Sequence, residues 1–291
     1  MRENGVADLH VHTTASDGDS TLEERLAHAE AAGLPVFAVT DHDCLHPALS
    51  APVVERDRAL VVSGAEIRAG VNGQEVELLG YFLDPETSSL KRVLERIQQH
   101  RVDRNRAIVA ALRAETNLTA TYSTLVDGAD NVLTRPHIAA RLVSEGIVES
   151  RAAAFREYLG AGAETHEPLT LVDHSAVIDA VHDAGGVASL AHPGYLHAGD
   201  EDGSESPLRT AVRTLASAGL DALEVTYDYG PDGFMPARAA ALAAEFDLLT
   251  TGGSDCHGPT PGTTSIGDMR ISQSQFDRLC QRADVAVRTP R

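Results

Sequence analysis

The sequence predicts an α/β fold in which parallel strands form a barrel or a doubly wound sheet, and three observations support this. Short apolar runs alternate along most of the chain with Ala-, Leu-, Glu- and Arg-rich segments of helical period, which is typical of βαβ units. The runs are apolar on both strand faces, as in strands that are buried on both sides. At least six such runs are present, and the 291 residues, 43% of them hydrophobic, can bury the core of one large domain or two modest ones.

The individual elements follow from these patterns in order. The first strand is the run VADLHV, and the helix after it begins at Thr21, a favourable N-cap, and ends at Gly33, a favourable helix stop. We expect strands at residues 6–11, 35–43, 59–67, 75–83, 186–193, 220–227 and 247–257, and helices at residues 21–33, 175–185, 207–219 and 235–246.

The segment 89–174 differs from the rest because it shows no strand pattern. Residues 89–117 predict one long helix or two abutting helices, and residues 135–148 and 150–162 predict two more. No linker separates this segment, and the alternating pattern continues on both sides. We therefore expect a sheet domain formed by residues 1–88 and 175–291, with residues 89–174 as a helical insertion.

Composition limits the partners and the compartment. The formal charge is −19, and Lys91 is the one lysine, so the chain repels long nucleic acids and a phosphate ligand needs a local patch of metal or arginine. Three scattered cysteines fit a reducing cytoplasm, although one disulfide stays possible. The N-terminal residues lack a signal-peptide pattern, and no apolar run is long enough to span a membrane. The oligomeric state is left open.

The stretch DLHVHTTASDG places His10 and His12 two residues apart at the end of the first expected strand. Side chains at i and i+2 lie on one strand face, so both imidazoles point the same way. Imidazole is a common metal ligand. A single pair of this kind is more often a surface feature or a satisfied polar group, so the interpretation depends on the other strands.

Almost every other expected strand also carries a residue able to bind a metal, mostly near its carboxyl end. In parallel α/β barrels these ends gather ligands and catalytic groups. Each residue alone could be a loop polar group or a helix cap, as Asp41 or Asp43 could be, but the repetition favours a metal site. The nine candidate ligands are His10, His12, Asp17, His42, Glu66, Glu77, His192, Asp255 and His257.

Nine ligands are more than one ion needs. One ion with an open position takes three or four protein ligands, so this set suits two or three divalent ions, with Glu66 as the expected bridge. Mixed imidazole and carboxylate ligation fits Mn, Fe or Zn better than Ca or Mg. The absence of thiolates argues against a structural zinc cluster. A multinuclear centre with open positions activates water and holds a phosphoryl group.

The motifs DLHVHTTASDG, AVTDHD, SGAEI, LAHPG and GGSDCHG, in this order, resemble the Polymerase and Histidinol Phosphatase (PHP) family over the whole chain. The segments RPHIAARLVSEGIV and AGGVASLAHP resemble its branch of nucleotide phosphatases and an RNA 5′-end exonuclease. The resemblance implies a distorted seven-stranded (β/α) barrel, a helical insertion over the barrel mouth, and hydrolysis of phosphate esters with two or three ions, commonly Mn, Fe or Zn.

The resemblance also implies how the ligands divide, and the chain departs from the branch at two places. Histidine usually stands where this chain has Glu77, and a lysine usually follows the last helix of the insertion, whereas AGAETHEPLTLVDHS has none. Glu77 can instead face solvent. In the family pattern one ion is held by His10, His12, Glu66 and Asp255, a second by Asp17, His42 and His257, and a third by Glu66, position 77 and His192.

The expected reaction is attack on phosphorus by a hydroxide that bridges the ions. Arginines then orient the phosphate, and Arg135 is favoured because the following Pro136 would fix it near the barrel mouth. His137 is a substrate contact, the acid for the leaving group or a spare ligand. Arg101 and Arg104 are further substrate contacts, or alternatively a solvated helical face. We assign His192, His137 and Asp255 to catalysis, and Arg135, His137, Arg101, Arg104 and His42 to substrate binding.

The function expected from these features is hydrolysis of a small phosphate monoester, that of a nucleotide or of another phosphorylated metabolite. One alternative is a 5′-3′ exonuclease that acts on short RNA, for which a short channel of arginines could suffice. Another alternative is a non-catalytic metal-binding module, which degenerate ligands would favour. Eight of the nine positions hold the residue types of the family pattern, which favours an enzyme.

Overall fold

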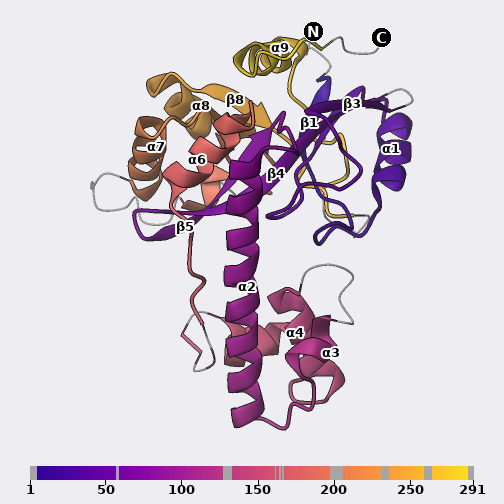
Figure 1. Cartoon of the computed structure of the whole chain (residues 1–291), viewed down its shortest axis with the longest axis vertical. Helices are drawn as coiled ribbons and strands as arrows, with labels where there is room; N and C mark the ends of the chain where they lie inside the picture. Colours follow the sequence, from indigo (N-terminus) through magenta and orange to yellow (C-terminus); the bar gives the residue numbers. More distant parts are fainter. Residues whose placement is uncertain are drawn as a thin grey trace. The chain divides into compact units, whose positions relative to one another are not determined.

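The computed structural model describes residues 5–56, 59–126, 133–160, 162–163, 165, 167–196, 206–230, 236–258 and 264–287. The chain divides into two compact units, which we describe separately: a sheet unit of residues 1–94 and 172–291, and a helical unit of residues 95–171 (Figure 1). The sequence-based boundaries at 88/89 and 174/175, and a position of the helical segment over a barrel mouth, stay predictions.

The sheet unit has the predicted α/β fold, with one mostly parallel sheet. Hydrogen-bonded neighbours follow the path β1-β2-β4-β5-β6-β7-β8, and β3 pairs with β4 off this path. The strands are β1 (Ala7–Val11), β2 (Val36–Val39), β3 (Val53–Arg56), β4 (Ala59–Val71), β5 (Gln74–Tyr81), β6 (Val187–Leu190), β7 (Ala222–Thr226) and β8 (Leu249–Gly252). The short strand β3 was not predicted.

The expectation of a parallel sheet is wrong for β5, which runs antiparallel to both β4 and β6. The reason is local, because β4 and β5 form a hairpin in place of a βαβ unit. Asn72 and Gly73 join the strands with φ angles of 51° and 79°, and positive φ at both central residues is the geometry of a tight hairpin turn. The dipeptide Asn-Gly is a strong sequence signal for such a turn.

The two ends of the strand path approach each other. An isolated parallel bridge joins Val11 to Cys256, and the backbone N–H of His12 donates to the Cys256 carbonyl at 3.1 Å. Gly253 permits this approach, since a Cβ atom there would lie 2.3 Å from the backbone nitrogen of His10. Full closure into the distorted seven-stranded barrel stays a prediction.

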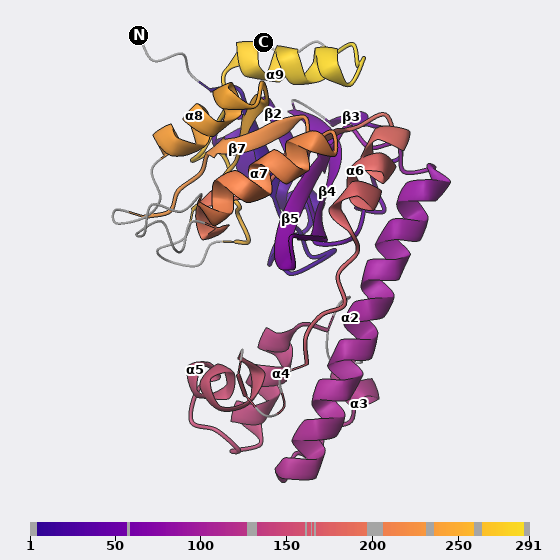
Figure 2. The same cartoon turned by 90° about the vertical axis from the view of Figure 1, so that its left-hand side faces the viewer.

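The helices of the sheet unit cover the strands. The predicted cap of α1 is confirmed: the hydroxyl of Thr21 accepts from Glu24 N at 3.3 Å, and Gly33 follows the helix with φ of 60°. Helix α6 packs on β4, β5 and β6, and α8 packs on β7 and β8 (Figure 2). The helices are α1 (Leu22–Ala31), α6 (His174–Asp183), the 3₁₀ turn η2 (Pro193–Leu196), α7 (Pro207–Ser217), α8 (Pro236–Glu245) and α9 (Gln273–Arg282). Residue 235, with which one predicted helix begins, lies outside the described residues.

Helix α9, which was not predicted, belongs to the amino end of the sheet. Ile271, which lies just before α9, pairs with Ala7 at the start of β1. Phe276 and Leu279 of α9 are buried in an apolar cluster with alternate residues of the strands. The other members of this cluster include Leu9, Val36, Ala38, Leu60, Val62, Leu79, Tyr81 and Ala222.

The helical unit has its own apolar core, and its described residues contain no strand. Helix α2 begins in the sheet unit and continues into the helical unit. Ile108, Leu112, Ile138, Leu142 and Leu159 are among the core residues. The helices are α2 (Ser88–Glu115), α3 (Tyr122–Val126), α4 (Arg135–Ser144), α5 (Arg151–Ala154) and the π-helical turn η1 (Phe155–Leu159). Across the described parts of both units, no helix is both long and apolar enough to cross a membrane.

Candidate metal centre

All nine candidate ligands lie at one edge of the sheet, where the parallel strands end. Because β5 runs in the opposite direction, its beginning lies at this same edge, and Glu77 therefore joins the site from a strand start. His10, Glu66 and Glu77 lie within β1, β4 and β5, whereas His12, Asp17, His42, His192, Asp255 and His257 lie in the loops that follow β1, β2, β6 and β8.

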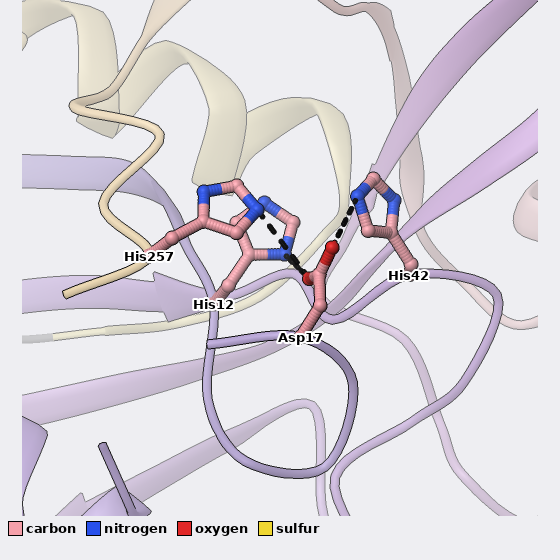
Figure 3. Close-up of side chains that lie close together, drawn as sticks. All are labelled: His12, Asp17, His42 and His257. Atoms are coloured by element: carbon pink, nitrogen blue, oxygen red, sulfur yellow. Dashed lines mark ion pairs between the residues drawn. The ribbon is translucent and has the colours of Figure 1, made fainter. Parts of the chain in front are cut away.

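The first group of ligand atoms surrounds Asp17 (Figure 3). Its carboxylate lies 3.4 Å from Nε2 of His257, 3.6 Å from Nε2 of His42 and 3.8 Å from Nδ1 of His12. The rings of His12 and His257 stack with centroids 4.0 Å apart. One carboxylate among three imidazoles is a ligand set suited to a divalent transition metal.

The second group lies deeper and is centred on Glu66. Nε2 of His10 and Nε2 of His12 each lie 3.4 Å from a carboxylate oxygen of Glu66. The same two nitrogens lie 3.3 and 3.1 Å from Oδ1 of Asp255. Two imidazoles and two carboxylates therefore face one another within the span that a single ion would bridge.

The third group contains Glu77. Nε2 of His192 lies 2.9 Å from Glu66 and 3.2 Å from Glu77, and Nδ1 of His42 lies 3.0 Å from Glu66 and 3.7 Å from Glu77. The side chain of Glu77 is 19% exposed. The alternative in which Glu77 faces solvent is therefore wrong, and its role as a ligand stays a prediction.

Arg68 gives Glu77 a second partner. The two residues pair across the hairpin of β4 and β5, and Nε of Arg68 donates to Oε1 of Glu77 at 3.1 Å. Arg68 also lies 3.3 Å from Glu75. One oxygen of Glu77 thus faces a guanidinium and the other faces His192, so the extra carboxylate beside Glu66 is partly balanced by a cation of the protein.

Unpaired buried atoms show that this donor set fits metal ions. Among the described residues, Nε2 of His10, both ring nitrogens of His12, Nδ1 of His42 and Oδ1 of Asp255 are buried without a hydrogen-bond partner. Leaving such atoms unpaired costs about 1–3 kcal/mol each. Their concentration at one place, all as imidazole or carboxylate atoms, is the state expected of ligands whose partner is a metal ion.

The centre has a buried floor and an open rim. The side chains of His10, His12 and Glu66 are 0 to 1% exposed, whereas those of Asp17 and His257 are 32% and 40% exposed. Asp255 is intermediate at 21%. A substrate can therefore reach the centre over Asp17, His257 and Asp255, but cannot reach its floor directly.

The electrostatics keep the carboxylates ionised. Burial works to raise the pKa of Glu66, but the charges of His42 and His10 outweigh it and hold this pKa well below its ordinary value. Burial has the same tendency at Asp17, where the hydrogen bond with His257 and the charge of His42 lower the pKa. Burial works to lower the pKa of His257, but Asp17 raises it to about 9. The carboxylates and imidazoles thus hold one another in charged forms, and a divalent ion would bind in place of the histidine protons.

The backbone at this edge is strained. His192 and Asp255 have φ angles of 26° and 53°, in the left-handed region that non-glycine residues seldom adopt. Each such residue costs on the order of 1–3 kcal/mol. The strain turns both side chains toward the floor of the centre, where His192 meets Glu66 and Asp255 meets His10.

Glu224 in β7 is a positioning residue that the sequence interpretation missed. It is 1% exposed, and its two carboxylate oxygens accept from Nδ1 of His10 at 3.1 Å and from the backbone N–H of His192 at 2.6 Å. The hydrogen bond places the proton of His10 on Nδ1 and leaves Nε2 to face Glu66 and Asp255. A carboxylate behind a ligand histidine fixes its orientation and increases its basicity.

Two buried aspartates hold the loops that carry ligands. Asp41 accepts from the backbone N–H and the hydroxyl of Thr13, both at 2.8 Å, and from the Ser16 hydroxyl at 2.7 Å, which orders the loop that ends at Asp17. Asp8 accepts from the backbone N–H and hydroxyl of Ser254 at 2.9 and 2.7 Å. Asp8 thereby ties β1 to the loop that carries Asp255.

The predicted substrate contacts outside the metal groups all lie in the helical unit. Arg101 is buried, with 6% exposure, so it does not lie on a solvated face. Nε of Arg104 donates to the Glu167 carbonyl at 2.8 Å. Arg135 donates to the Leu159 carbonyl at 3.4 Å, and Nδ1 of His137 accepts from Thr134 N at 3.1 Å at the start of α4. These contacts stabilise the unit, and a part in substrate binding stays a prediction.

The fold and the site together define the class of metal-dependent hydrolases, in which imidazoles and carboxylates at one edge of an α/β sheet hold divalent ions. The family model described as PHP domain matches residues 8–132. A 5′-3′ exoribonuclease of Haemophilus influenzae is 30% identical over 255 residues, covering 87% of this chain and 90% of that protein. The chain belongs to the PHP family of metal-dependent phosphoesterases, as the motifs predicted.

Two further comparisons agree with this assignment. A 3′,5′-nucleoside bisphosphate phosphatase of Chromobacterium violaceum is 28% identical over 267 residues, covering 89% of this chain and 90% of that protein. Among solved structures, a protein of Bifidobacterium adolescentis described as a metal-dependent phosphoesterase is 26% identical, with a TM-score of 0.74, and the match covers 95% of this chain and 96% of that one.

Proposed function

We propose that this protein hydrolyses the phosphate monoester of a small metabolite with two or three ions of Mn, Fe or Zn. A nucleotide is the first candidate for this substrate. The observation that carries the proposal is the overlap of the three ligand groups. His12 is common to the first two groups, His42 to the first and third, and Glu66 to the second and third. The three groups are therefore neighbours, and Glu66, whose two carboxylate oxygens can each bind an ion, would join ions that together clamp a phosphoryl group.

The ions, when bound, lower the pKa of water and neutralise charge on the phosphoryl oxygens. The part of the protein is to hold its ligand atoms in place. Glu224 directs Nε2 of His10 inward, and Tyr227 donates to Oδ2 of Asp255 at 2.9 Å, so Oδ1 faces His10. We assign the catalytic roles to Asp255 and His192 because both contact the buried floor and are partly exposed, so a substrate can touch them.

The charge of the chain favours a small substrate. A net charge of −19 with a single lysine repels a long polyanion, whereas a small phosphate ester needs only the local cationic centre. We also propose that the protein works in the reducing cytoplasm, because Cys44, Cys256 and Cys280 form no disulfide with one another.

A 5′-3′ exonuclease activity on short RNA is the second candidate. The named activity of the Haemophilus influenzae relative favours it. A short RNA carries a 5′ phosphate and few further charges, so the acidic surface opposes it less than it opposes long RNA. The two candidates use the same metal centre and differ in what the substrate carries beyond its phosphate.

We further propose that the helical unit supplies phosphate contacts through Arg135, with Arg101, Arg104 and His137 as additional contacts. Arg135→Ala is expected to lower kcat/KM, with a loss of about 1.5–3 kcal/mol in transition-state binding, because it removes a charge-assisted hydrogen bond. Arg151→Ala, at the start of α5 in the same unit, is the matched control. An unchanged kcat/KM for Arg135→Ala would remove this residue from the site.

The proposed function is tested by release of inorganic phosphate from a panel of phosphorylated metabolites and 5′-phosphorylated short RNAs, with added Mn. We expect release from at least one small monoester, and loss of this release in Asp255→Asn but not in Asp183→Asn, which alters an exposed aspartate on α6. Shortening of RNA without release from small esters would favour the exonuclease. No hydrolysis of any substrate with Mn, Fe or Zn would contradict both candidates.

A further inference from the structure

Three tyrosines gather beside His192, outside the metal groups. The chain is poor in aromatic residues, with six tyrosines, six phenylalanines and no tryptophan, so three tyrosines in one place is a marked concentration. Tyr195 lies in the turn η2, three residues after His192. Tyr227 and Tyr229 follow the end of β7, which is the neighbour of β6, the strand that His192 follows.

The rings form one connected cluster. The ring centroid of His192 lies 5.1 Å from that of Tyr195 and 5.7 Å from that of Tyr227. Tyr195 meets Tyr227 and Tyr229 edge to face, with ring centroids 6.2 and 5.7 Å apart. The ring centroids of Tyr227 and Tyr229 are 4.5 Å apart. These are favourable separations for aromatic pairs, so the three rings support one another next to the centre.

Hydrogen bonds hold this cluster in place before any ligand binds. The hydroxyl of Tyr229 accepts from the backbone N–H of Gly194 at 2.9 Å, which fixes the turn that carries Tyr195. The hydroxyls of Tyr195 and Tyr227 lie 3.3 Å apart, and Tyr227 in turn donates to Asp255. A preset surface of this kind loses little conformational entropy when a ligand binds.

Exposure singles out Tyr195 as the surface of the cluster. Its side chain is 67% exposed, and within the described part of the chain it is the one large hydrophobic side chain with such exposure, whereas Tyr227 and Tyr229 are partly buried beneath it. An exposed aromatic ring backed by two others and lying next to a catalytic centre presents a flat apolar face to whatever occupies that centre.

We propose that Tyr195, supported by Tyr227 and Tyr229, stacks against a planar aromatic ring of the substrate and so selects nucleotides, or other phosphate esters with a planar ring, over esters with none. The inference rests on the proposed function, because it assumes that the phosphate lies at the metal centre. A phosphate bound beside His192 would leave its substituent within reach of the Tyr195 ring, whose centroid lies 5.1 Å from that of His192. We call Tyr195, Tyr227 and Tyr229 the aromatic platform. Every nucleobase has a face that can stack on tyrosine, so the platform accepts different bases.

The platform is tested by binding, which needs no turnover. Phenylphosphonate and methylphosphonate share one head group, their P–C bonds resist hydrolysis, and only phenylphosphonate carries a ring. Calorimetric titration into the Mn-loaded protein is expected to give tighter binding of phenylphosphonate. Tyr195→Ala is expected to weaken that binding by roughly fivefold to tenfold and methylphosphonate binding by less than about twofold, whereas Tyr195→Phe retains both affinities.

Several results would overturn the platform. These are equal affinities of the two phosphonates for the unaltered protein, no measurable binding of either, equal losses in Tyr195→Ala, or no loss. Tyr195→Leu separates stacking from apolar contact, because leucine keeps an apolar side chain without a ring face, and full affinity in this variant would also contradict stacking. Failure of the proposed function is read separately, as an absence of phosphate release from the metabolite panel.

Discussion

The two ends of the same sheet bury side chains equally well but in different ways. At the amino end, Phe276 and Leu279 of α9 are 1% and 0% exposed and pack only in an apolar cluster. At the carboxyl end, His10 and His12 are both 0% exposed, yet their ring nitrogens include three without a hydrogen-bond partner. Burial alone therefore does not distinguish structure from function. What marks the carboxyl end is that several unpaired buried imidazole and carboxylate atoms gather at one place, whereas the apolar cluster holds the lone hydroxyl of Tyr81.

The carboxyl end also holds carboxylates close together around single histidines. Glu66 and Glu77 both lie beside His192, and Glu66 and Asp255 both lie beside His10. Such features lower stability unless a ligand compensates them. The amino end stabilises the fold, and the carboxyl end uses part of this stability to keep a reactive centre in place.

The largest expected effect follows from breaking the amino end. Phe276→Ala leaves a cavity where the ring meets Phe82, whose centroid lies 6.1 Å away, and should lower the free energy of unfolding by about 3–5 kcal/mol. Urea denaturation measures this loss, and Phe276→Leu should lose less. If the two ends are separate in function, kcat/KM per folded molecule stays unchanged. A fall in kcat/KM at temperatures where the variant is folded would break the comparison.

A smaller effect is expected where the protein supports the metal centre without joining it. Glu224→Ala removes the acceptor behind His10, so affinity for the metal should fall by about tenfold to a hundredfold. Glu224→Gln keeps one acceptor oxygen and should lose less. Competition with a chromophoric chelator measures the affinity, and Glu245→Ala, which alters a surface carboxylate paired with Arg209, is the control. Unchanged affinity in folded Glu224→Ala would contradict the positioning role.

The most local of the three effects concerns Glu77, because one ligand group is altered while the other two remain. If Glu77 is a ligand, Glu77→Ala should lose about one ion per chain and most activity, whereas Glu77→His should retain much of both. Metal analysis and turnover of the same preparations decide this. Full metal content and rate in Glu77→Ala would mean that the carboxylate serves only to pair with Arg68.

Much of the fold could be predicted because periodicity and caps are local signals. The run VADLHV and the Thr21 cap gave β1 and α1 in their observed places. The antiparallel direction of β5 was also readable in Asn72-Gly73, but the alternation of strands and helices elsewhere dominated the interpretation. Helix α9 had a local signal too, since Ser272 and Gln275 form a capping box before Phe276.

The candidate site was predictable as far as residue types and strand ends specify it. His10 and His12 were recognisable because imidazoles seldom recur at strand ends without a role. Glu224 was not, because a lone acidic residue in LDALEVTY reveals its importance only once β7 lies beside β6 and behind His10. The sharing of His12 and His42 between groups likewise depends on three-dimensional distances that no spacing in the sequence encodes.

The central claim is that the unsatisfied atoms at the carboxyl end are the ligands of a multinuclear metal centre. The most direct measurement is elemental analysis of the purified protein beside the double variant His10→Ala, His12→Ala and the control His28→Ala, which alters an exposed histidine of α1. We predict about two or three equivalents of transition metal in the protein and the control, with metal and phosphate release lost together in the double variant. Less than about half an equivalent of metal in active protein would contradict the account.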